Sequence, residues 1–177
     1  FNAAWAPGEQ MGSMRDGSGD HFFAHFSAAG GWLKGFVHEA TMSPFSQEPP
    51  TVWPGVLESV PVEFAECLKE PAFNLDETTF CLWRRPTDDE WQIGPIEFPG
   101  GELDPDGSGE LLSPLDGDPE TYQRWAEEYY ECDVNLAAVE QIYAHAPLTA
   151  ALLKQLAPNR PLSALVPEAE EIGYPLQ

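Results

Sequence analysis

The chain has 177 residues, and 42% of them are hydrophobic, with six Trp and ten Phe, which excludes wholesale disorder. Thirty Asp and Glu oppose eight Lys and Arg. The resulting net charge of −22 argues against binding to nucleic acid or to an anionic membrane and favours a basic protein partner. The alternative interpretation is that the charge only keeps an abundant cytosolic protein in solution. At this length we expect a single domain, residues 1–177.

The cysteines and the apolar runs bear on the compartment. Cys67, Cys81 and Cys132 are odd in number and widely spaced, so they favour neither a disulfide framework nor a thiolate zinc site. We infer a reducing compartment, the cytoplasm. No run approaches the roughly 18 apolar residues of a membrane span, and no leader is recognisable, although the chain begins with Phe1 rather than Met.

The first twenty residues are expected to hold two short elements. Phe1–Trp5 is read as the end of a helix that Pro7 and Gly8 stop, and Met11–Met14 as a short edge strand. A turn built from residues 16–19 (DGSG) follows it.

Residues 21–38 (HFFAHFSAAGGWLKGFVH) predict a β-hairpin, because two aromatic and β-branched runs flank a reversal that contains two glycines. With the turn centred on Ala29 and Gly30, His21 faces His38. One face of the hairpin is apolar and is expected to pack on the core: Phe22, Ala24, Phe26, Leu33, Gly35 and Val37. The other face is half polar: His21, Phe23, His25, Lys34, Phe36 and His38.

The middle of the chain predicts a loop, a helix and a second hairpin. Residues 39–57 contain four prolines and form the loop. Ser59 is read as the N-cap of a helix that ends before Pro71. Residues 78–85 and 90–98 are two strand-like runs joined by a polar turn, and a Gly, Pro and Asp loop, residues 99–117, follows them.

The pattern becomes helical at residue 118. Asp118, Asn135 and Thr149 each precede a run with helical spacing of apolar residues and are predicted as N-caps of three helices. Strands before helices indicate an α+β fold, in which an antiparallel sheet of two hairpins, within residues 11–98, packs against a C-terminal set of helices, within residues 118–172.

The half-polar face of the first hairpin is one candidate metal site. His21 and His38 would lie opposite each other, with His25 along the same face, so the three could bind a divalent metal with Asp20 or Glu39 as a fourth ligand. Histidines on half-buried strands more often bond to backbone or water.

A second candidate metal site is the loop that begins at Asp104. Asp104, Asp106 and Ser108 place oxygen donors at alternate positions of the loop, and Gly109 is its sixth residue. This pattern resembles the first half of an EF-hand calcium loop. The twelfth position is Leu115 instead of Glu, and no entering helix precedes the loop. The alternative is an acidic surface turn that caps a short helix.

The distribution of charge suggests a binding surface for a partner. Eighteen Asp and Glu lie between Asp76 and Glu140 against three Arg, a local net charge of −15. Aromatic side chains interleave with these acids, a combination typical of interfaces with basic partners. The candidate partner-binding residues are Trp91, Glu120, Glu127, Glu128 and Glu131. If the aromatics were core residues instead, the acids would form only a solvated face.

Several segments carry resemblances. GDHFFAHF, GGWLKGFVHE, VWPGVLESVP and DGDPETYQRWAEEYYE resemble a group of bacterial proteins of unknown function, a resemblance that implies no activity. Residues 60–68 (VPVEFAECL) are faintly similar to a helix of Smi1/Knr4-type domains, which include toxin-immunity proteins.

We therefore expect a non-catalytic, cofactor-free protein that binds another protein, as immunity proteins and inhibitors do. The alternative is a metal-dependent enzyme or metal-binding protein that uses His21, His25 and His38. A DNA mimic is a third possibility. No nucleophile elbow or phosphate loop supports catalysis, and the oligomeric state is left open.

Overall fold

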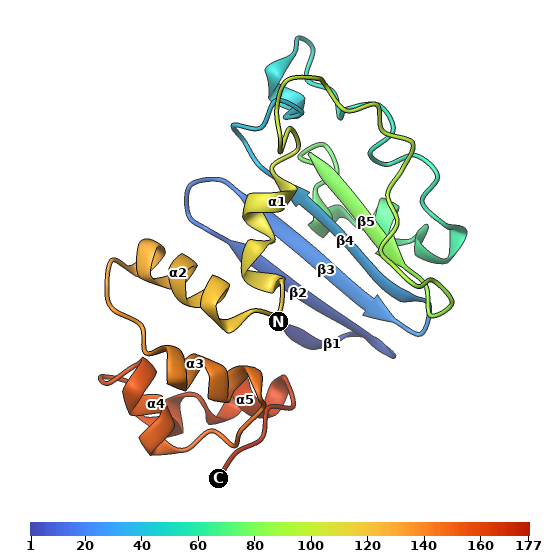
Figure 1. Ribbon diagram of the computed structural model, residues 1–177. Coiled ribbons are helices and arrows are strands. Elements are labelled where there is room, and N and C mark those ends of the chain that lie inside the picture. Colours follow the sequence, from blue (N-terminus) through green and yellow to red (C-terminus); the bar gives the residue numbers. More distant parts are fainter. The chain divides into compact units, whose positions relative to one another are not determined.

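The computed structural model describes residues 1–177 as two compact units, residues 1–111 and residues 112–177 (Figure 1). The first unit contains an open five-stranded antiparallel sheet, and the second unit contains four α-helices and no strand. The α+β class predicted from the sequence is confirmed. No helix combines the length and the apolar character that a membrane crossing needs.

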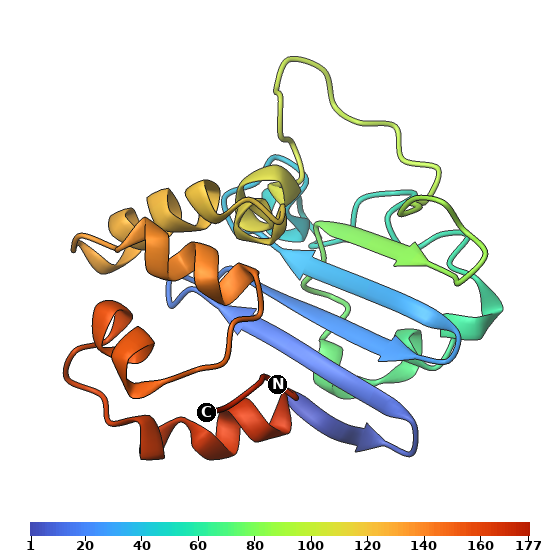
Figure 2. The ribbon, with the colours of Figure 1, turned by 60° about the horizontal axis from the view of Figure 1, so that its bottom comes forward.

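The sheet follows the order of the chain, so that each strand pairs with the next one (Figures 1 and 2). The strand expected at Met11 is present as part of β2, but it lies inside the sheet rather than at its edge, because the first residues form a strand beside it rather than the end of a helix. Gly8, at φ 80°, makes the tight reversal that lets these residues pair. The strands are β1 (Asn2–Ala6), β2 (Glu9–Arg15), β3 (His21–Ser27), β4 (Gly30–Phe36) and β5 (Phe80–Arg84).

The β3–β4 hairpin is present, but its predicted register is wrong by two residues. Ser27 pairs with Gly30 and His21 with Phe36, so the turn consists of Ala28 and Ala29. Gly30 does not serve the turn as predicted. Its φ is 123°, and a Cβ there would lie 2.1 Å from the carbonyl oxygen of Arg84 on β5. A close approach of the neighbouring strand therefore requires this glycine.

A shift of two residues leaves every side chain on its predicted face, and the half-polar face is buried as well as the apolar one. The half-polar face lies in the main core, where Trp32 and Lys34 are completely buried. On the apolar face, Ala24 and Leu33 are buried as expected, whereas Phe26 is 43% exposed. The core on the half-polar face is formed by Phe23, Trp32, Met42, Val56, Phe64, Cys67, Phe73, Cys81 and Trp83.

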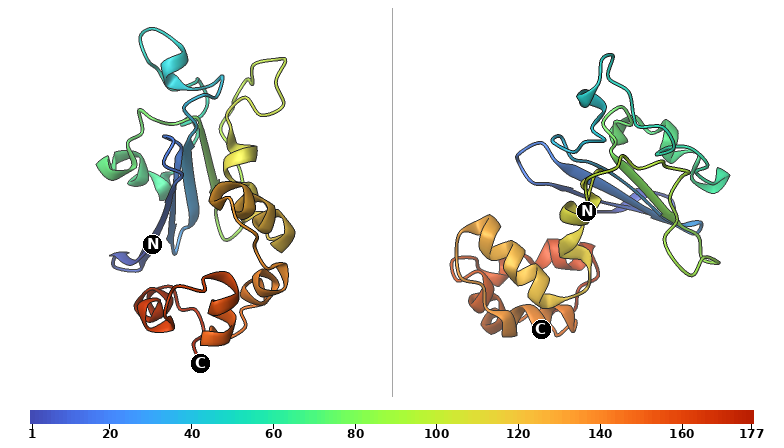
Figure 3. Two further views of the ribbon diagram at one scale, coloured as in Figure 1. Left: turned by 90° about the vertical axis from the view of Figure 1, so that its left-hand side faces the viewer. Right: turned by 45° about the horizontal axis from the view of Figure 1, so that its top comes forward.

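Short turns rather than the predicted helix cover this core. Figure 3 (left) shows the segment after residue 60 along one side of the sheet, opposite α1 (Ser108–Leu111). Ser59 has a φ of 61° and caps no helix, and Pro61 and Pro71 limit the segment to single turns. The 3-10 turns of the first unit are η1 (Pro44–Ser46), η2 (Val62–Phe64), η3 (Cys67–Lys69) and η4 (Pro71–Phe73).

The second predicted hairpin is reduced to one strand, β5, and one bridge between Trp83 and Gln92. Beyond the bridge the chain leaves β5 because Gly94 approaches the 53–58 loop. A Cβ at Gly94 would lie 1.9 Å from the carbonyl oxygen of Gly55. Pro95 also lacks the N–H that a continued ladder would need.

The three helix starts predicted in the second unit are confirmed. The side chains of Asp118, Asn135 and Thr149 accept hydrogen bonds from the backbone N–H groups of Glu120, Ala138 and Leu152. A small apolar core forms around Ala138, Leu148, Leu152 and Leu153. The elements are η5 (Ser113–Leu115), α2 (Pro119–Tyr130), α3 (Leu136–Tyr143), α4 (Ala150–Leu156), η6 (Leu162–Ala164) and α5 (Val166–Glu171).

Candidate functional site

A buried lysine is the chemically most unusual group of the first unit. Lys34 comes from the middle of β4 and has no exposed surface. Its Nζ donates to the backbone carbonyl oxygens of Glu77, at 2.6 Å, and Asn74, at 3.3 Å, and lies 3.3 Å from Nε2 of His21. An ammonium group has three protons, and each has an acceptor here. The Phe23 ring, 5.4 Å from Nζ, adds a cation–π contact.

Burial lowers the pKa of Lys34 to about 8, and the nearby Glu77 carboxylate offsets only part of the desolvation. With this pKa, Lys34 is still mostly in the ammonium form at pH 7. Its three protons have the three acceptors described above. Lys34 thereby fixes the turn of residues 74–77 against the sheet.

His21 connects Lys34 to the surface. Its Nδ1 lies 3.3 Å from the carbonyl oxygen of Gly19, and its Nε2 faces the Lys34 ammonium. We infer the tautomer in which Nδ1–H donates to Gly19 and Nε2 accepts from Lys34. Burial, with the Lys34 charge next, lowers the pKa of His21, so the ring is neutral at pH 7.

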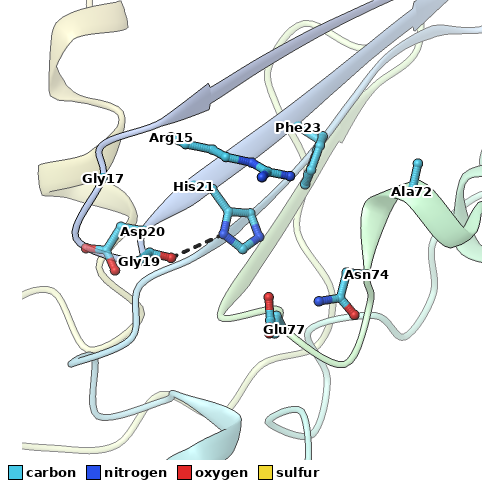
Figure 4. Close-up of a pocket in the computed structure, with 9 residues that line it drawn as sticks. All are labelled: Arg15, Gly17, Gly19, Asp20, His21, Phe23, Ala72, Asn74 and Glu77. Atoms are coloured by element: carbon cyan, nitrogen blue, oxygen red, sulfur yellow. Dashed lines mark hydrogen bonds between the residues drawn. The ribbon is translucent and has the colours of Figure 1, made fainter.

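A pocket of about 450 Å³ opens beside this pair (Figure 4). The β2–β3 turn forms one wall, the residues after η4 form the opposite wall, and His21 and Phe23 of β3 lie between them. The lining residues are Arg15, Gly17, Gly19, Asp20, His21, Phe23, Ala72, Asn74 and Glu77.

At the other end of β3, the imidazole of His25 lies between a carboxylate and a thiol. His25 Nε2 is 2.9 Å from Glu9 Oε2, and His25 Nδ1 is 3.5 Å from Cys67 Sγ. Burial raises the pKa of Cys67 to about 12, with a contribution from Glu9. A thiol with this pKa is protonated at pH 7 and is a poor nucleophile, so the arrangement serves to satisfy the buried His25.

The structure does not assemble the predicted histidine cluster. His21 pairs with Phe36 across the strands, and His38 follows β4, where its Nδ1 lies 2.6 Å from Asp20 Oδ1. This hydrogen bond raises the pKa of His38. No group of three or more His, Cys, Asp and Glu side chains is arranged to hold a metal ion.

The loop at Asp104 uses its oxygen atoms to begin α1. The two carboxylate oxygens of Asp104 accept from the N–H groups of Gly109 and Glu110. Asp106 accepts from the N–H of Ser108, and burial, with the neighbouring Asp104, raises the pKa of Asp106. This arrangement is the acidic turn that caps a short helix, the predicted alternative to a calcium loop.

An acidic and aromatic surface occupies the C-terminal half of α2. Trp125 stacks on Tyr129 with ring centroids 5.2 Å apart, and Tyr130 meets Tyr129 edge to face at 5.0 Å. Tyr129 is 47% exposed and Tyr130 is 59% exposed. We call this set the α2 surface: Trp125, Glu127, Glu128, Tyr129, Tyr130 and Glu131.

The acids of the α2 surface make no salt bridge within the chain. Glu127 accepts hydrogen bonds from Gln123 and from the N–H of Val134, whereas Glu128 and Glu131 project from exposed positions. Glu120 is exposed in the first turn of the same helix.

Trp91 belongs to the first unit, where its ring lies over Gly31 together with that of Phe26. It is 43% exposed. The α2 surface is therefore defined without it.

Sequence patterns did not single out Arg15, Asn74 or Glu77. Their signal is weak, because each lies in a turn or at the end of an element with no periodicity around it. A lysine between the apolar residues Leu33 and Phe36 is the one usable signal, since a fully buried Lys is rare.

Comparisons of this chain with protein-family models, with curated proteins and with solved structures find no match.

Proposed function

We propose that this chain is a non-catalytic binding protein that takes a basic protein partner on the α2 surface, in the manner of an inhibitor or immunity protein. The proposal rests on one observation: Glu128 and Glu131 lie beside exposed aromatic rings at a helix end that disfavours negative charge.

The electrostatics of α2 give the first support. The C-terminus of a helix carries partial negative charge, so acids there cost stability, while Lys and Arg would add to it. The last turn of α2 has no basic residue. Residues that break a local rule without a structural gain are frequently kept for function.

The backbone of Glu131 gives the second support. Its φ of 52° places it in the left-handed region, where glycine or asparagine is the usual residue at a helix end. A glutamate is strained there. The Glu131 carboxylate makes no hydrogen bond or ion pair that would offset this strain.

The aromatic rings supply the anchors. Tyr and Trp contribute much of the binding energy at protein interfaces, because they combine large apolar area with a polar tip. Surrounding acids steer a basic partner toward them and exclude acidic competitors.

Removal of two charges tests the proposal. Glu128→Gln with Glu131→Gln should weaken capture of a basic protein from a lysate of the source cells by about tenfold or more, the loss of about 1.4 kcal/mol. Affinity of the isolated pair is then measured by calorimetry at low and high salt. Binding by the unaltered chain should fall as salt rises.

Glu140→Gln with Glu170→Gln is the matched control, because it removes the same charge from exposed positions on α3 and α5. Equal weakening in both double variants would show a general effect of net charge and contradict the proposal. Retention of the partner at full affinity by the Glu128 and Glu131 variant would also contradict it.

Glu131→Gly separates stability from binding. Glycine relieves the left-handed strain, so the free energy of unfolding of the second unit should rise by about 1 kcal/mol. Partner affinity should fall in the same variant, because a carboxylate is lost. Thermal unfolding and calorimetry check the two effects. A variant that is less stable, or that binds more tightly, would refute the account of Glu131.

A further inference from the structure

The pocket beside His21 carries two opposite charges, Arg15 and Glu77, neither of which makes a salt bridge within the chain. Arg15, at the end of β2, has no carboxylate within 4 Å, and its guanidinium carbon lies 6.0 Å from the centre of the Phe23 ring. Glu77 makes no salt bridge and uses only backbone groups to bind Lys34 and Asn74. Figure 4 shows the Arg15 side chain on one side of the His21 ring and Glu77 on the other.

The remaining polar groups of the pocket are either occupied or neutral. Asp20 Oδ1 accepts from the backbone N–H of His38 and pairs with its ring. His21 uses both ring nitrogens, on Gly19 and on Lys34. The Asn74 side-chain amide, by contrast, makes no hydrogen bond within the chain and faces the pocket near Glu77 (Figure 4).

The shape of the pocket limits what these groups can bind. A volume of about 450 Å³ suits a small molecule, and Phe23 and Ala72 supply apolar lining. A guanidinium binds a carboxylate in a planar fork, whereas a carboxylate and an amide oxygen bind an ammonium group. The two partners lie on opposite walls, so one ligand with both groups would satisfy both.

We propose that this pocket binds a small zwitterion, a free α-amino acid or a molecule with the same pair of end groups. The ligand carboxylate pairs with Arg15, its ammonium with Glu77 and the Asn74 amide, and its side chain lies on Phe23 and Ala72. This site lies in the first unit and is independent of the α2 surface.

Titration of the full-length chain with each standard L-amino acid, followed by two-dimensional amide NMR, tests the site. A ligand should shift the amide signals of Gly17, Gly19 and His21 in a saturable manner. The N-acetyl and the carboxamide derivative of the best ligand each lack one charged end, and each should bind about tenfold or more weakly.

Two variants test which residue pairs with each charged end of the ligand. In Arg15→Met the amino acid and its carboxamide should bind equally well, because the carboxylate partner is gone. In Glu77→Gln the amino acid and its N-acetyl derivative should bind equally well. Arg84→Met and Glu63→Gln, at exposed positions that do not line the pocket, should leave all affinities unchanged.

Three results would overturn the proposal. The first is the absence of shifts at the pocket amides with every amino acid up to about 10 mM, a concentration at which even weak sites fill. The second is tight binding of the derivatives that lack a charged end. The third is a set of shifts confined to residues outside the pocket. Retention of the native spectrum in each variant shows that the fold is intact.

Discussion

Gly35→Ala should destabilise the first unit by about 3 kcal/mol or more, since overpacking in a well-packed core has costs of this order. Gly35 pairs with Phe80 across β4 and β5, and the outer end of the Phe80 ring lies against the glycine. An added Cβ would be 2.0 Å from Phe80 Cζ and within 2.7 Å of two more ring atoms. Phe80 is only 1% exposed, so its ring has no free space to move into.

Urea unfolding followed by tryptophan fluorescence measures this loss, because Trp32 and Trp83 are buried on the same two strands, β4 and β5. Gly100→Ala is the control, since no atom lies within 4 Å of a Cβ there, and the free energy of unfolding should stay within about 0.5 kcal/mol. Phe80→Leu added to Gly35→Ala should recover part of the loss because it removes the ring. A loss below about 0.5 kcal/mol in Gly35→Ala would contradict the described packing.

The β3–β4 hairpin shows how far a local pattern reaches. Alternation of residue types assigned each side chain to the correct face, because either placement of the turn in residues 28–31 keeps the period of two. The register was wrong because the deciding contact is not local. Gly30 faces the carbonyl oxygen of Arg84, a residue far along the chain.

Burial of the half-polar face could not be predicted from the hairpin alone. A face that carries histidines and a lysine gives no sign of whether another segment covers it. The partners that permit burial lie elsewhere, in the backbone carbonyls of Asn74 and Glu77 and in the side chain of Glu9. Buried polar groups need such acceptors, and no pattern within residues 21–38 reveals them. The pocket beside His21 was unforeseen for the same reason.

The helices illustrate the opposite case. Asp118, Asn135 and Thr149 were predicted correctly because a cap and the helix it begins lie within three residues of each other. Residues 60–70 share the spacing of a helix but form 3-10 turns, because Phe64 and Cys67 are drawn into the core of the sheet. Tertiary contacts overrode the local preference there.

Lys34 should titrate with a pKa of about 8, well below the ordinary value of 10.5, because burial disfavours its charged form. Carbon-detected NMR on lysine-labelled protein measures this directly. The chain contains only two other lysines, Lys69 and Lys154, and the signal that disappears in Lys34→Met identifies the resonance. A pKa near 10.5 for Lys34 would contradict the prediction, because it would mean that burial does not disfavour the charged form of this amine.

The same shift predicts how stability depends on pH. Between about pH 8 and pH 10.5 the unfolded chain holds the Lys34 proton while the folded chain has released it, so the contribution of Lys34 to the free energy of unfolding rises with pH. The full rise is about 3 kcal/mol, of which about 1 kcal/mol falls between pH 7 and pH 9.

Two buried thiols make the free energy of unfolding fall as pH rises, opposite to the effect of Lys34. The measurement must therefore separate the two effects. Burial raises the pKa values of Cys67 and Cys81 to about 12, so their ionisation in the unfolded chain lowers stability above about pH 9. The stability difference between the unaltered chain and Lys34→Met cancels most of this effect, because both proteins keep both thiols and only Cys81 interacts with the Lys34 charge. That difference should shift in favour of the unaltered chain by about 1 kcal/mol between pH 7 and pH 9. A constant difference would mean that the three acceptors around Lys34 compensate its desolvation completely.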